Sequence, residues 1–397
     1  KRIGGIKRVD VMKFEKLGNI ADIIAGQSPP SSTYNSEGNG IPFFQGKADY
    51  GEKYPTVRYW CTEPTKISMP DDILISMRAP VGPVNINTVE CCIGRGLSAI
   101  RVKKNVSRDF IYFWLKQNQH IIAAKQTGST FKAITQKILS EIVVPFPYYT
   151  DQLHIANLLS KSENLIAQRK ESIRLLDEFL KSAFLEMFGE CTKNEKNWKK
   201  VELKYFGEII TGNTPSRKND DNYSSNFIEW IKTDNIPVDD TYITTAVEYL
   251  SESGLRYART VEAGALLVAC IAGSIQSVGR AALTNRKVSF NQQINAIQPN
   301  EEIEPLFLYW LFKISRKYIQ DSASNGMKKI LTKGEFGKIK MIKPPIKLQT
   351  QFAQIVEKTE ALKTQYQQSL QELENLYGSL SQKAFRGELS VNQLAKA

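Results

Sequence analysis

Histidine and cysteine, which often perform catalysis or bind metals, are sparse in this chain of 397 residues. Its two histidines, His120 and His154, lie far apart in the sequence and stand in no metal-binding or triad motif. Both are interpreted as ordinary surface or core residues. The five cysteines lack any Cys-x-x-Cys spacing, so they indicate neither a disulfide framework nor a zinc site, and free thiols fit a reducing cytosol. They are Cys61, Cys91, Cys92, Cys191 and Cys270.

Motifs of nucleotide-dependent and DNA-modifying enzymes are also missing from the sequence. No Gly-x-x-x-x-Gly-Lys-Ser/Thr phosphate-binding loop occurs. The string nearest to the Asn/Asp-Pro-Pro-Tyr/Phe motif of adenine methyltransferases is Lys-Pro-Pro-Ile at 343–346, which lacks the ligating side chains. A nuclease-like Glu-Leu-Lys at 202–204 stands without the upstream Pro-Asp that metal-dependent cleavage requires. The chain is therefore not expected to be an enzyme or to hold a metal or cofactor.

The composition favours binding to a polyanion. Lysine and arginine number 53 against 41 aspartate and glutamate, which gives a net charge of +12 and a pI of about 9.2. A basic surplus favours nucleic acid because phosphate contacts release counterions, although charge alone does not single out that partner. The hydrophobic content of 42% is typical of a folded protein, and the length allows two or three domains.

The elements that would position such contacts occur twice along the chain, at an offset of roughly 186 to 198 residues. A Gly-x-Ser/Thr-Pro segment stands at 26–29 and again at 212–215. Strand signals, a short aromatic helix and a closing apolar strand with proline repeat at similar offsets. These pairs fall at 72–78 and 265–271, 110–115 and 306–311, and 143–147 and 341–345. The duplication predicts two globular domains of mixed α/β fold.

After each copy the hydrophobic period changes to that of a long helix. The first helix is expected from about 150 to 187 and the second from 349 to about 385. Roughly 38 residues at 1.5 Å each give a helix of about 55 Å. Gly189 and Gly387 stand where C-terminal caps are expected. The apolar seam residues are Leu159, Ile166, Ile173 and Leu180 in the first helix, and Phe352, Tyr366, Leu373 and Leu380 in the second.

Two matched seams in one chain are most simply buried against each other. We therefore expect the long helices to pack as an antiparallel coiled coil with pseudo-two-fold symmetry. The order of globular domain, long helix, globular domain, long helix resembles that of the specificity (S) subunits of Type I restriction-modification systems, over essentially the whole chain. The segments 26–29 and 212–215 are similar to the Gly-x-Thr-Pro segment of that family's recognition domains. The string 383–389, Lys-Ala-Phe-Arg-Gly-Glu-Leu, resembles the family's ending of the second helix.

Some motifs depart from the family pattern. The first helix ends in Phe188-Gly189-Glu190, which lacks the arginine, and the helices begin with Asp151-Gln152 and Leu348-Gln349 in place of Glu-Gln. The resemblance implies a target-recognition domain at 1–149, a spacer helix at 150–190, a second target-recognition domain at 191–346, a second spacer helix at 347–390 and a tail at 391–397. Each recognition domain would read one half of a split, asymmetric site in double-stranded DNA.

The resemblance also implies partners. The helices would set the distance between half-sites and dock two modification subunits that methylate adenine with S-adenosylmethionine, and restriction subunits would join to cut DNA with ATP and magnesium. None of these cofactors is expected in this chain. The N-terminus has no apolar run typical of a signal peptide, and no segment approaches the roughly 20 apolar residues of a membrane span. We expect a cytoplasmic protein of a bacterium or archaeon.

Base readout requires Arg, Lys, Asn, Gln, Ser or Thr on loops, with lysines also on phosphates. The loops that follow apolar runs are the natural platform for these side chains. In the first domain the candidates are Ser28, Gln45, Lys47, Arg78, Arg95 and Lys132. In the second they are Lys218, Lys232, Asn235, Gln276, Arg280, Gln292, Gln293, Lys328 and Lys329.

Purely structural explanations of these candidate residues remain open at this point. A loop lysine is commonly just solvated, Gln292 and Gln293 could instead satisfy backbone groups, and the aromatic runs have the spacing of a helix core. Three other functions are also weighed: a fused methyltransferase or nuclease, an RNA-binding protein, for which no RRM or KH signature is present, and a protein-binding scaffold of two modules on a coiled-coil stalk without DNA specificity. Duplex binding that depends on salt would exclude the scaffold.

Overall fold

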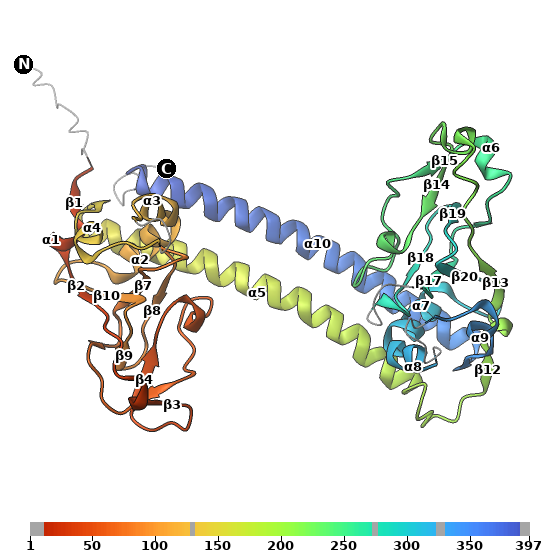
Figure 1. Cartoon of the computed structure of the whole chain (residues 1–397), viewed down its shortest axis with the longest axis horizontal. Coiled ribbons are helices and arrows are strands. Elements are labelled where there is room, and N and C mark those ends of the chain that lie inside the picture. Colours follow the sequence, from red (N-terminus) through yellow and green to blue (C-terminus); the bar gives the residue numbers. More distant parts are fainter. Residues whose placement is uncertain (1–11, 128–131, 272–276, 323–329, 390–397) are drawn as a thin grey trace, which may run out of the picture. The chain divides into compact units, whose positions relative to one another are not determined.

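The computed structural model describes residues 12–127, 132–271, 277–322 and 330–389 (Figure 1). The chain packs as two compact units. Unit 1 comprises residues 1–170 and 369–397, and unit 2 comprises residues 171–368. Each unit is a sheet-rich globular domain together with a part of each of the two long helices. The mixed α/β fold expected from the duplicated sequence is confirmed in both.

The main sheet of unit 1 has four antiparallel strands in the order β2-β10-β7-β8. They are β2 (Ala21–Ala25), β10 (Leu97–Val102), β7 (Ile73–Ser76) and β8 (Val84–Ile86). The register places Ile100 between Ile23 and Ile73, so β-branched side chains pack across all three strands. The central strands β7 and β10 carry nearly continuous apolar runs because both of their faces are covered.

A second sheet of unit 1 is built from very short strands in the order β3-β5-β4-β9-β6. They are β3 (Tyr34–Asn35), β5 (Trp60–Cys61), β4 (Ile41–Phe44), β9 (Cys91–Ile93) and β6 (Ile67–Ser68). The pair β4–β9 is parallel, with Phe43 opposite Cys92. A two-stranded ribbon pairs β1 (Phe14–Lys16) with β11 (Val143–Pro145) at the base of the domain.

Short helices complete the domain of unit 1: α1 (Leu17–Ile20), α2 (Arg108–Gln117), α3 (Gln119–Ala124) and α4 (Gln136–Ser140). The Ser107 hydroxyl caps α2 by accepting from the Phe110 N–H. Every side chain from Phe110 to Leu115 is buried. The aromatic run is therefore part of the core, as its helical spacing predicts.

Unit 2 repeats this topology, except that its second sheet has four strands and no counterpart of β3 among the described residues. Its main sheet, in the order β13-β20-β17-β18, comprises β13 (Gly207–Thr211), β20 (Ile294–Pro299), β17 (Leu266–Ala269) and β18 (Ala281–Leu283). The second sheet, in the order β15-β14-β19-β16, comprises β15 (Tyr249–Leu250), β14 (Ile228–Ile231), β19 (Val288–Phe290) and β16 (Thr260–Val261). The ribbon pairs β12 (Lys200–Glu202) with β21 (Lys340–Ile342). The helices are α6 (Glu252–Leu255), α7 (Pro305–Ile314), α8 (Arg316–Asp321) and α9 (Lys333–Lys338).

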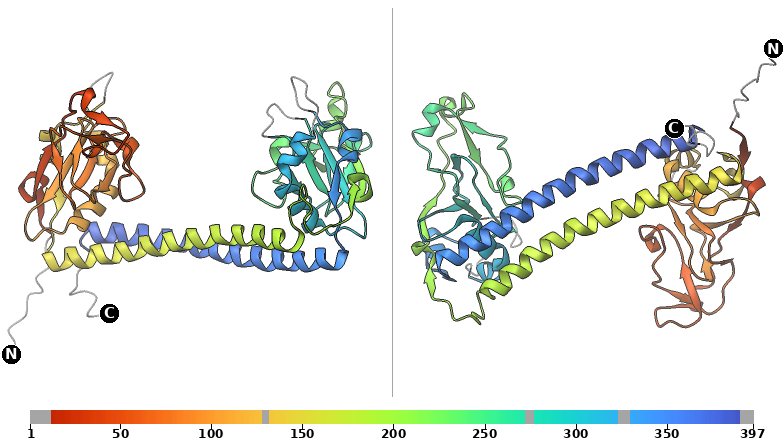
Figure 2. Two further views of the ribbon diagram at one scale, coloured as in Figure 1. Left: turned by 90° about the horizontal axis from the view of Figure 1, so that it is seen from below. Right: turned by 180° about the vertical axis from the view of Figure 1, so that it is seen from behind.

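The long helices are α5 (Tyr149–Phe188) and α10 (Ile346–Phe385), each of 40 residues. Within each unit their segments run side by side and antiparallel (Figure 2). In unit 1, Glu163 and Lys170 of α5 contact Tyr377 and Glu374 of α10. In unit 2, Lys363 of α10 pairs with Asp177 of α5 at 2.6 Å. Gly189 and Gly387 follow the two helices with φ of 73° and 79°, so the predicted glycine caps are confirmed.

The helix ends also complete the cores of the globular domains. In unit 2, Phe184 and Phe188 of α5 pack against Phe307 of α7 and Phe352 of α10. In unit 1, Phe385 of α10 packs edge-on against Phe110 of α2, with ring centroids 5.6 Å apart. Among the seam residues, Leu159, Leu180 and Phe352 are fully buried, whereas Ile166, Ile173, Tyr366, Leu373 and Leu380 are half-buried.

A buried glutamine in the first turn of each long helix fixes it to the domain before it. Gln152 accepts from the Ser107 N–H at 2.9 Å and donates to the Pro147 carbonyl at 2.9 Å. Gln349 accepts from the Glu304 N–H at 3.0 Å and donates to the carbonyls of Glu302 and Pro344. Each glutamine thus satisfies backbone groups that burial would otherwise leave unpaired.

The helices begin and end close to the predicted boundaries. α5 and α10 each start one residue earlier than the predicted spacer helices and end at 188 and 385, before the predicted 190 and 390. The tail 391–397 lies outside the described residues. In the described part of the chain, no helix has the length and apolar character needed to cross a membrane.

Candidate nucleic-acid interface

The Gly-x-Ser/Thr-Pro segment of unit 1 packs under the loop that follows β9. The Gly26 N–H donates to the Leu97 carbonyl, and the Gln27 N–H donates to the Ile93 carbonyl. A Cβ on Gly26 would lie 2.2 Å from the Gly94 carbonyl oxygen, so only glycine fits there. The Ser28 hydroxyl accepts from the Arg95 N–H at 3.3 Å. The segment therefore holds the loop that carries Arg95.

Unit 2 uses the matching segment in the same way. The Gly212 N–H donates to the Ile294 carbonyl, and the Asn213 N–H donates to the Phe290 carbonyl. A Cβ on Gly212 would lie 2.2 Å from the Asn291 carbonyl oxygen. The Thr214 hydroxyl donates to the side-chain oxygen of Gln292. Both segments thus support the loop that joins the second sheet to the main sheet, between β9 and β10 in unit 1 and between β19 and β20 in unit 2.

The remaining candidates of unit 1 lie on loops at this same end of the main sheet. Gln45 and Lys47 follow β4, whose Phe44 carbonyl accepts from the Gly94 N–H. Arg78 follows β7 and forms an isolated bridge with Ala133, beside Lys132. All six candidates of unit 1 therefore stand on loops that are hydrogen-bonded to one another or to neighbouring strand ends. The side chains of Gln45, Lys47, Arg78, Arg95 and Lys132 are exposed, as is Ser28.

A hollow of about 760 Å³ opens between these loops. Asp49 lies in it and ends the one-turn 3-10 helix η2 (Lys47–Asp49). Its Oδ2 accepts from the N–H groups of Gln45 (2.7 Å) and Gly46 (3.2 Å). Its Oδ1 accepts from Nε and Nη2 of Arg58 at 2.9 and 2.5 Å. One buried carboxylate therefore both closes the turn and positions an arginine.

In unit 2 the corresponding turn is η5 (Thr233–Asn235), and its candidate residues divide by exposure. Asn235 is buried: it accepts from the Lys232 N–H at 3.0 Å and donates to the Thr245 carbonyl at 3.0 Å. Its amide groups are used inside the loop, so Asn235 shapes the turn and does not face solvent. Lys232 is half-buried and pairs with Glu248. Lys218 is exposed on the loop after Pro215.

The other candidates of unit 2 lie on the loops beside this turn. Arg280 donates from Nη2 to the Thr233 carbonyl at 3.3 Å. Gln293 accepts from the Asn291 side chain at 3.0 Å, and its own carbonyl accepts from the N–H groups of Cys270 and Ile271. Gln292 is exposed. The remaining candidates, Gln276, Lys328 and Lys329, lie outside the described residues.

Sequence reasoning missed three charged residues on these surfaces. Arg217 pairs with Glu248 at 2.5 Å and stacks on Tyr223 and Trp230, with its guanidinium 4.4 and 5.2 Å from the ring centroids. Hydrogen bonds from Lys232 and then Arg217 lower the pKa of the Glu248 carboxyl. Arg58 is the third. Arg217 stands two residues after Pro215 and could have been found from that spacing, whereas nothing local in sequence marks Arg58 or Glu248.

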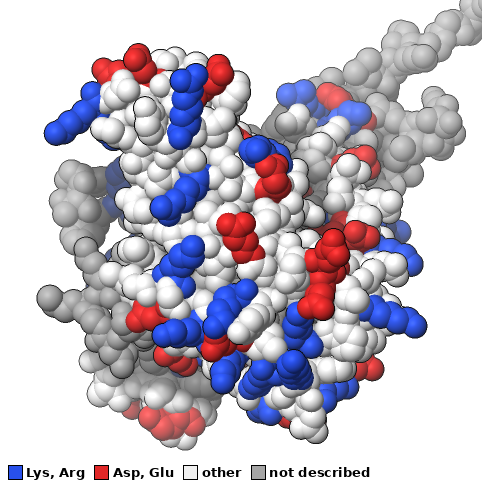
Figure 3. Space-filling view, turned by 90° about the vertical axis from the view of Figure 1, so that its right-hand side faces the viewer, with Lys and Arg blue, Asp and Glu red and all other residues white. Residues whose placement is uncertain are grey.

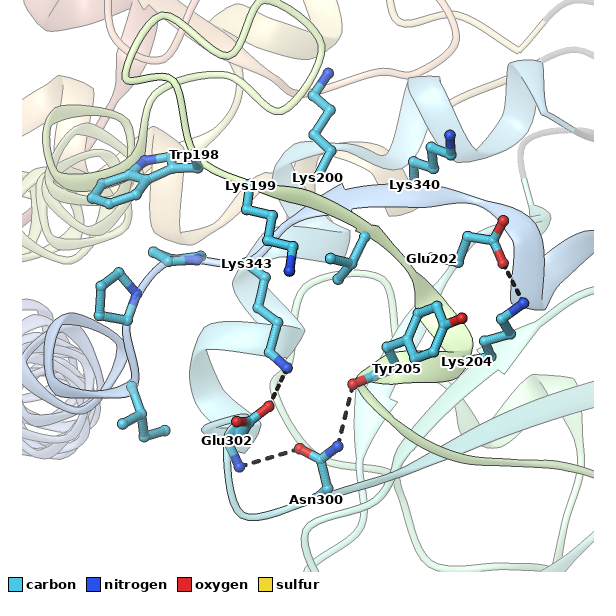
Figure 4. Close-up of a pocket in the computed structure, with 14 residues that line it drawn as sticks. Trp198, Lys199, Lys200, Glu202, Lys204, Tyr205, Asn300, Glu302, Lys340 and Lys343 are labelled. Atoms are coloured by element: carbon cyan, nitrogen blue, oxygen red, sulfur yellow. Dashed lines mark hydrogen bonds and ion pairs between the residues drawn. The ribbon is translucent and has the colours of Figure 1, made fainter.

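A different basic hollow, of about 1110 Å³, lies at the opposite end of the main sheet of unit 2 (Figure 4). The hollow is lined by five lysines and two glutamates, namely Lys199, Lys200, Lys204, Lys340, Lys343, Glu202 and Glu302. Lys343 pairs with Glu302, and Lys204 pairs with Glu202. Lysine and arginine side chains gather on the side of unit 2 that carries β12 (Figure 3). The strand β13 separates this hollow from Gly212, a span of about 17 Å for five residues.

The residues that the structure describes offer no candidate metal centre and no reactive thiol. Within that part of the chain, no group of three His, Cys, Asp or Glu side chains is placed to hold a metal ion. The five cysteines are buried and unpaired. Burial raises the pKa of the Cys91 and Cys270 thiols to about 12, which keeps them protonated and unreactive at neutral pH. The chemistry that the loop surfaces support is hydrogen bonding and charge pairing.

Comparisons with known proteins agree with this reading of the fold. The sequence pattern of the Type I restriction modification DNA specificity domain matches residues 9–175 and 195–375. A putative Type I restriction enzyme specificity subunit of Methanocaldococcus jannaschii is 46% identical over 160 residues, which are 39% of this chain but only 38% of that relative. The specificity subunit of the EcoBI enzyme of Escherichia coli is 21% identical over 420 residues, covering 96% of this chain and 86% of that protein.

A solved structure shares the fold as well. The crystal structure of the S subunit of a Type I restriction-modification system from M. genitalium superimposes with a TM-score of 0.60 at 16% identity. The match covers 96% of this chain and 98% of that one. At this identity the likeness concerns the fold alone, and it extends over both units.

Proposed function

This chain belongs to the Type I restriction-modification DNA specificity family, and on that premise we propose that it is the DNA-reading subunit of such a complex. Each unit reads one half of a split site in double-stranded DNA. The two sets of loops carry different side chains, so the two half-sites differ and the full site is asymmetric. The chain itself is not an enzyme and needs no cofactor of its own.

The observation that supports this proposal is the repeated gathering of polar and cationic side chains at one end of each main sheet. In unit 1 these are Gln45, Lys47, Arg78 and Arg95, all of which are exposed. The segment around Gly26 supports the loop of Arg95, and that loop hydrogen-bonds to Phe44 and Met77, which precede the other two loops. Loops fixed by backbone hydrogen bonds can present donors to base edges at low entropic cost. A protein-binding scaffold gives no reason for this arrangement to recur in both units.

The long helices serve as spacer and dock in this proposal. Forty residues at 1.5 Å each correspond to about 60 Å of helix. Leu165 and Leu376 in unit 1, and Leu175 and Phe179 in unit 2, are each about half exposed on these helices. Apolar side chains held out to solvent favour burial against a partner protein. We assign that partner as the modification subunit, one copy for each unit.

The reactions belong to the partners. Modification subunits would methylate adenine with S-adenosylmethionine, and restriction subunits, where present, would cut DNA with ATP and magnesium. A modification subunit that acts on a base inside a duplex must extrude that base into its own pocket, so the specificity subunit need only hold the duplex. Work on chromosomal DNA would place the complex in the cytoplasm of a bacterium or archaeon.

The test is a methylation map. We would co-express the chain with the modification subunit of its host and locate methylated adenines across the genome by long-read sequencing. The expected result is a single motif of two short blocks around a fixed gap. Replacing residues 191–346 with those of another specificity subunit should change one block and leave the other intact. Co-purification of the two subunits without any such motif would reject the assignment, and failure to co-purify would instead favour the scaffold.

A further inference from the structure

Arg58 is fixed at the recognition end of unit 1 by a carboxylate that solvent does not reach. The Asp49 side chain is 1% exposed and that of Arg58 is 48% exposed. The hydrogen bonds from Nε and Nη2 to one carboxylate oxygen hold the plane of the guanidinium. Since a guanidinium has five N–H donors, three are left for another acceptor. Within the described residues, Nη1 of Arg58 makes no hydrogen bond to the protein.

The fold of the turn does not require this ion pair. In unit 2 the neutral Asn235 closes the corresponding turn by accepting from the Lys232 N–H and donating to the hydroxyl of Thr244 and the carbonyl of Thr245. No arginine among the described residues hydrogen-bonds to Asn235; Arg280 donates instead to the Thr233 carbonyl of the same turn. Asparagine alone therefore satisfies the backbone at this position, and the aspartate–arginine pair of unit 1 needs another explanation.

The surroundings of Arg58 indicate what the free donors could bind. The hollow that Arg58 lines also contains Gln45, Lys47, Tyr34 and Tyr59. The negative charge of Asp49 is balanced by the positive charge of Arg58. The charge of Lys47 therefore makes the lining of the hollow net positive. A planar guanidinium with two parallel donors fits the O6 and N7 atoms of guanine, and it also fits a phosphate.

We propose that Arg58 donates hydrogen bonds to the DNA of the first half-site, and that the buried Asp49 is the positioning residue that orients it. The ligand chemistry is a pair of neighbouring acceptor atoms, on a guanine edge in the major groove or on a phosphate. This inference rests on the proposed function, because it assigns a contact within the recognition surface of unit 1.

A second ion pair of the same kind provides the matched control. Arg101 donates from Nε and Nη2 to Asp72 at 2.9 and 2.8 Å, and their side chains are 42% and 3% exposed. Arg101 lies near the end of β10, opposite Asp22 of β2, whereas Gly26 and the recognition loops lie at the other end of the same strands. A structural role alone would make the two arginines equivalent. A DNA contact would make only Arg58 matter for binding.

The experiment measures duplex binding and methylation by the complex of this chain with its modification subunit. Arg58→Ala should weaken binding to the mapped site by about 10- to 100-fold, and Arg101→Ala should change it by less than about twofold. A guanine contact predicts that Arg58→Lys fails as badly as Arg58→Ala and that one base of the first block is no longer discriminated. A phosphate contact predicts that Arg58→Lys retains most binding and that the loss is uniform over sequences, with a shallower salt dependence.

Folding is controlled by a variant that copies the turn of unit 2. In Asp49→Asn/Arg58→Met the amide can close the turn and no buried carboxylate is left unpaired, so the melting temperature should stay near that of the wild type. This variant should bind DNA as weakly as Arg58→Ala. Wild-type binding and an unchanged motif in the double variant would overturn the proposal while leaving the proposed function intact. A wild-type complex that methylates no split motif would overturn both.

Discussion

The turn after β4 in unit 1 and the turn after β14 in unit 2 share a backbone shape but are closed by different chemistry. The first uses a buried aspartate paired with Arg58, and the second uses a buried asparagine that pairs with threonine side-chain and backbone groups. Each turn follows a strand of four residues and forms a 3-10 helix of three residues. In each unit a closely packed glycine supports the neighbouring loop. The difference teaches that the scaffold fixes where the loop stands, while the side chains on it are free to differ between the two units.

The comparison assumes that Gly26 and Gly212 support equivalent neighbouring loops, whose Gly94 and Asn291 N–H groups donate to the strand ends just before the two turns. Gly26→Ala and Gly212→Ala each place a Cβ 2.2 Å from a backbone oxygen, which forces the backbone to move. Each should cost about 3 kcal/mol, which is a drop of roughly 6–12 °C in melting temperature for a unit of this size. Thermal unfolding of the two variants measures the effect.

The matched control is Gly46→Ala in the recognition turn, where no heavy atom lies within 4 Å of the added Cβ and the backbone is extended. Its melting temperature should stay within about 2 °C of the wild type. If Gly26→Ala and Gly212→Ala lower the melting temperature by very different amounts, the two segments do not support their loops equally. The comparison between the two turns would then fail.

Exchanging the closing residues sharpens the comparison. In Asn235→Asp a carboxylate oxygen would face the Thr245 carbonyl that now accepts from the amide, and no arginine compensates. The expected loss is about 2 kcal/mol. Asp49→Asn keeps an acceptor for the Gln45 N–H and should cost less, about 1 kcal/mol. Chemical denaturation of the single variants gives both values, and the reverse order would show that charge does determine the fold of the turn.

Unit 2 places an ion pair elsewhere, between Glu229 of β14 and Arg286, and this pair predicts a pH dependence. The hydrogen bond from Arg286 lowers the pKa of the Glu229 carboxyl. A lowered pKa in the folded state means that the stabilisation is complete above the ordinary glutamate value of about 4.3 and is lost as the pH falls through the folded-state value. Glu229→Gln should therefore melt roughly 2–4 °C below the wild type at pH 7, and the gap should close at an acidic pH, as the pH falls through the lowered pKa of Glu229.

A surface pair of the same unit serves as reference. Glu262 and Lys287 are both more than half exposed, so Glu262→Gln should change the melting temperature little at either pH. A gap for Glu229→Gln that persists unchanged in acid would mean that the loss comes from packing and not from charge.

The smallest effect is expected at the lysine hollow at the other end of unit 2. Lys199→Gln/Lys340→Gln should change the affinity for the methylated motif by less than about twofold, because β13 separates these residues from the recognition loops. Lys47→Gln in unit 1 should instead weaken binding and reduce the slope of affinity against salt by about one. Titrations at several salt concentrations measure both variants. If Lys199→Gln/Lys340→Gln and Lys47→Gln lose equal affinity for DNA, the DNA-binding surface of unit 2 would include the lysine hollow.

Much of the architecture could be predicted from the sequence because its signals are local. The heptad runs predict α5 and α10, the glycines predict their ends, and the apolar runs predict β7 and β17. The two antiparallel helix segments within each unit follow from the need to bury matched seams. The duplication also placed the Gly-x-Ser/Thr-Pro segments at equivalent points of the two folds.

The second sheets and the side-chain pairs could not be predicted. Strands of two residues, such as β5 and β6, are too short to have a period. Arg58 stands nine residues from Asp49 in a loop without pattern, and only the folded chain brings them together. Asn235 has the residue type of a base-contacting side chain, yet the fold uses its amide for the turn. A residue type suggests a contact, but burial decides whether the contact is available.

The core of unit 2 is assembled from three separate stretches of the chain. Leu180, Phe184 and Phe188 come from α5, Phe307 and Trp310 come from α7, and Phe352 comes from α10. A gene that acquires a new recognition domain by recombination at the helix boundaries keeps the first and third stretches and replaces the second. The incoming domain must then present aromatic side chains that fit an inherited surface. Any exchange of this domain, such as the replacement of residues 191–346, is therefore constrained at the base of the domain by the packing of a few phenylalanines.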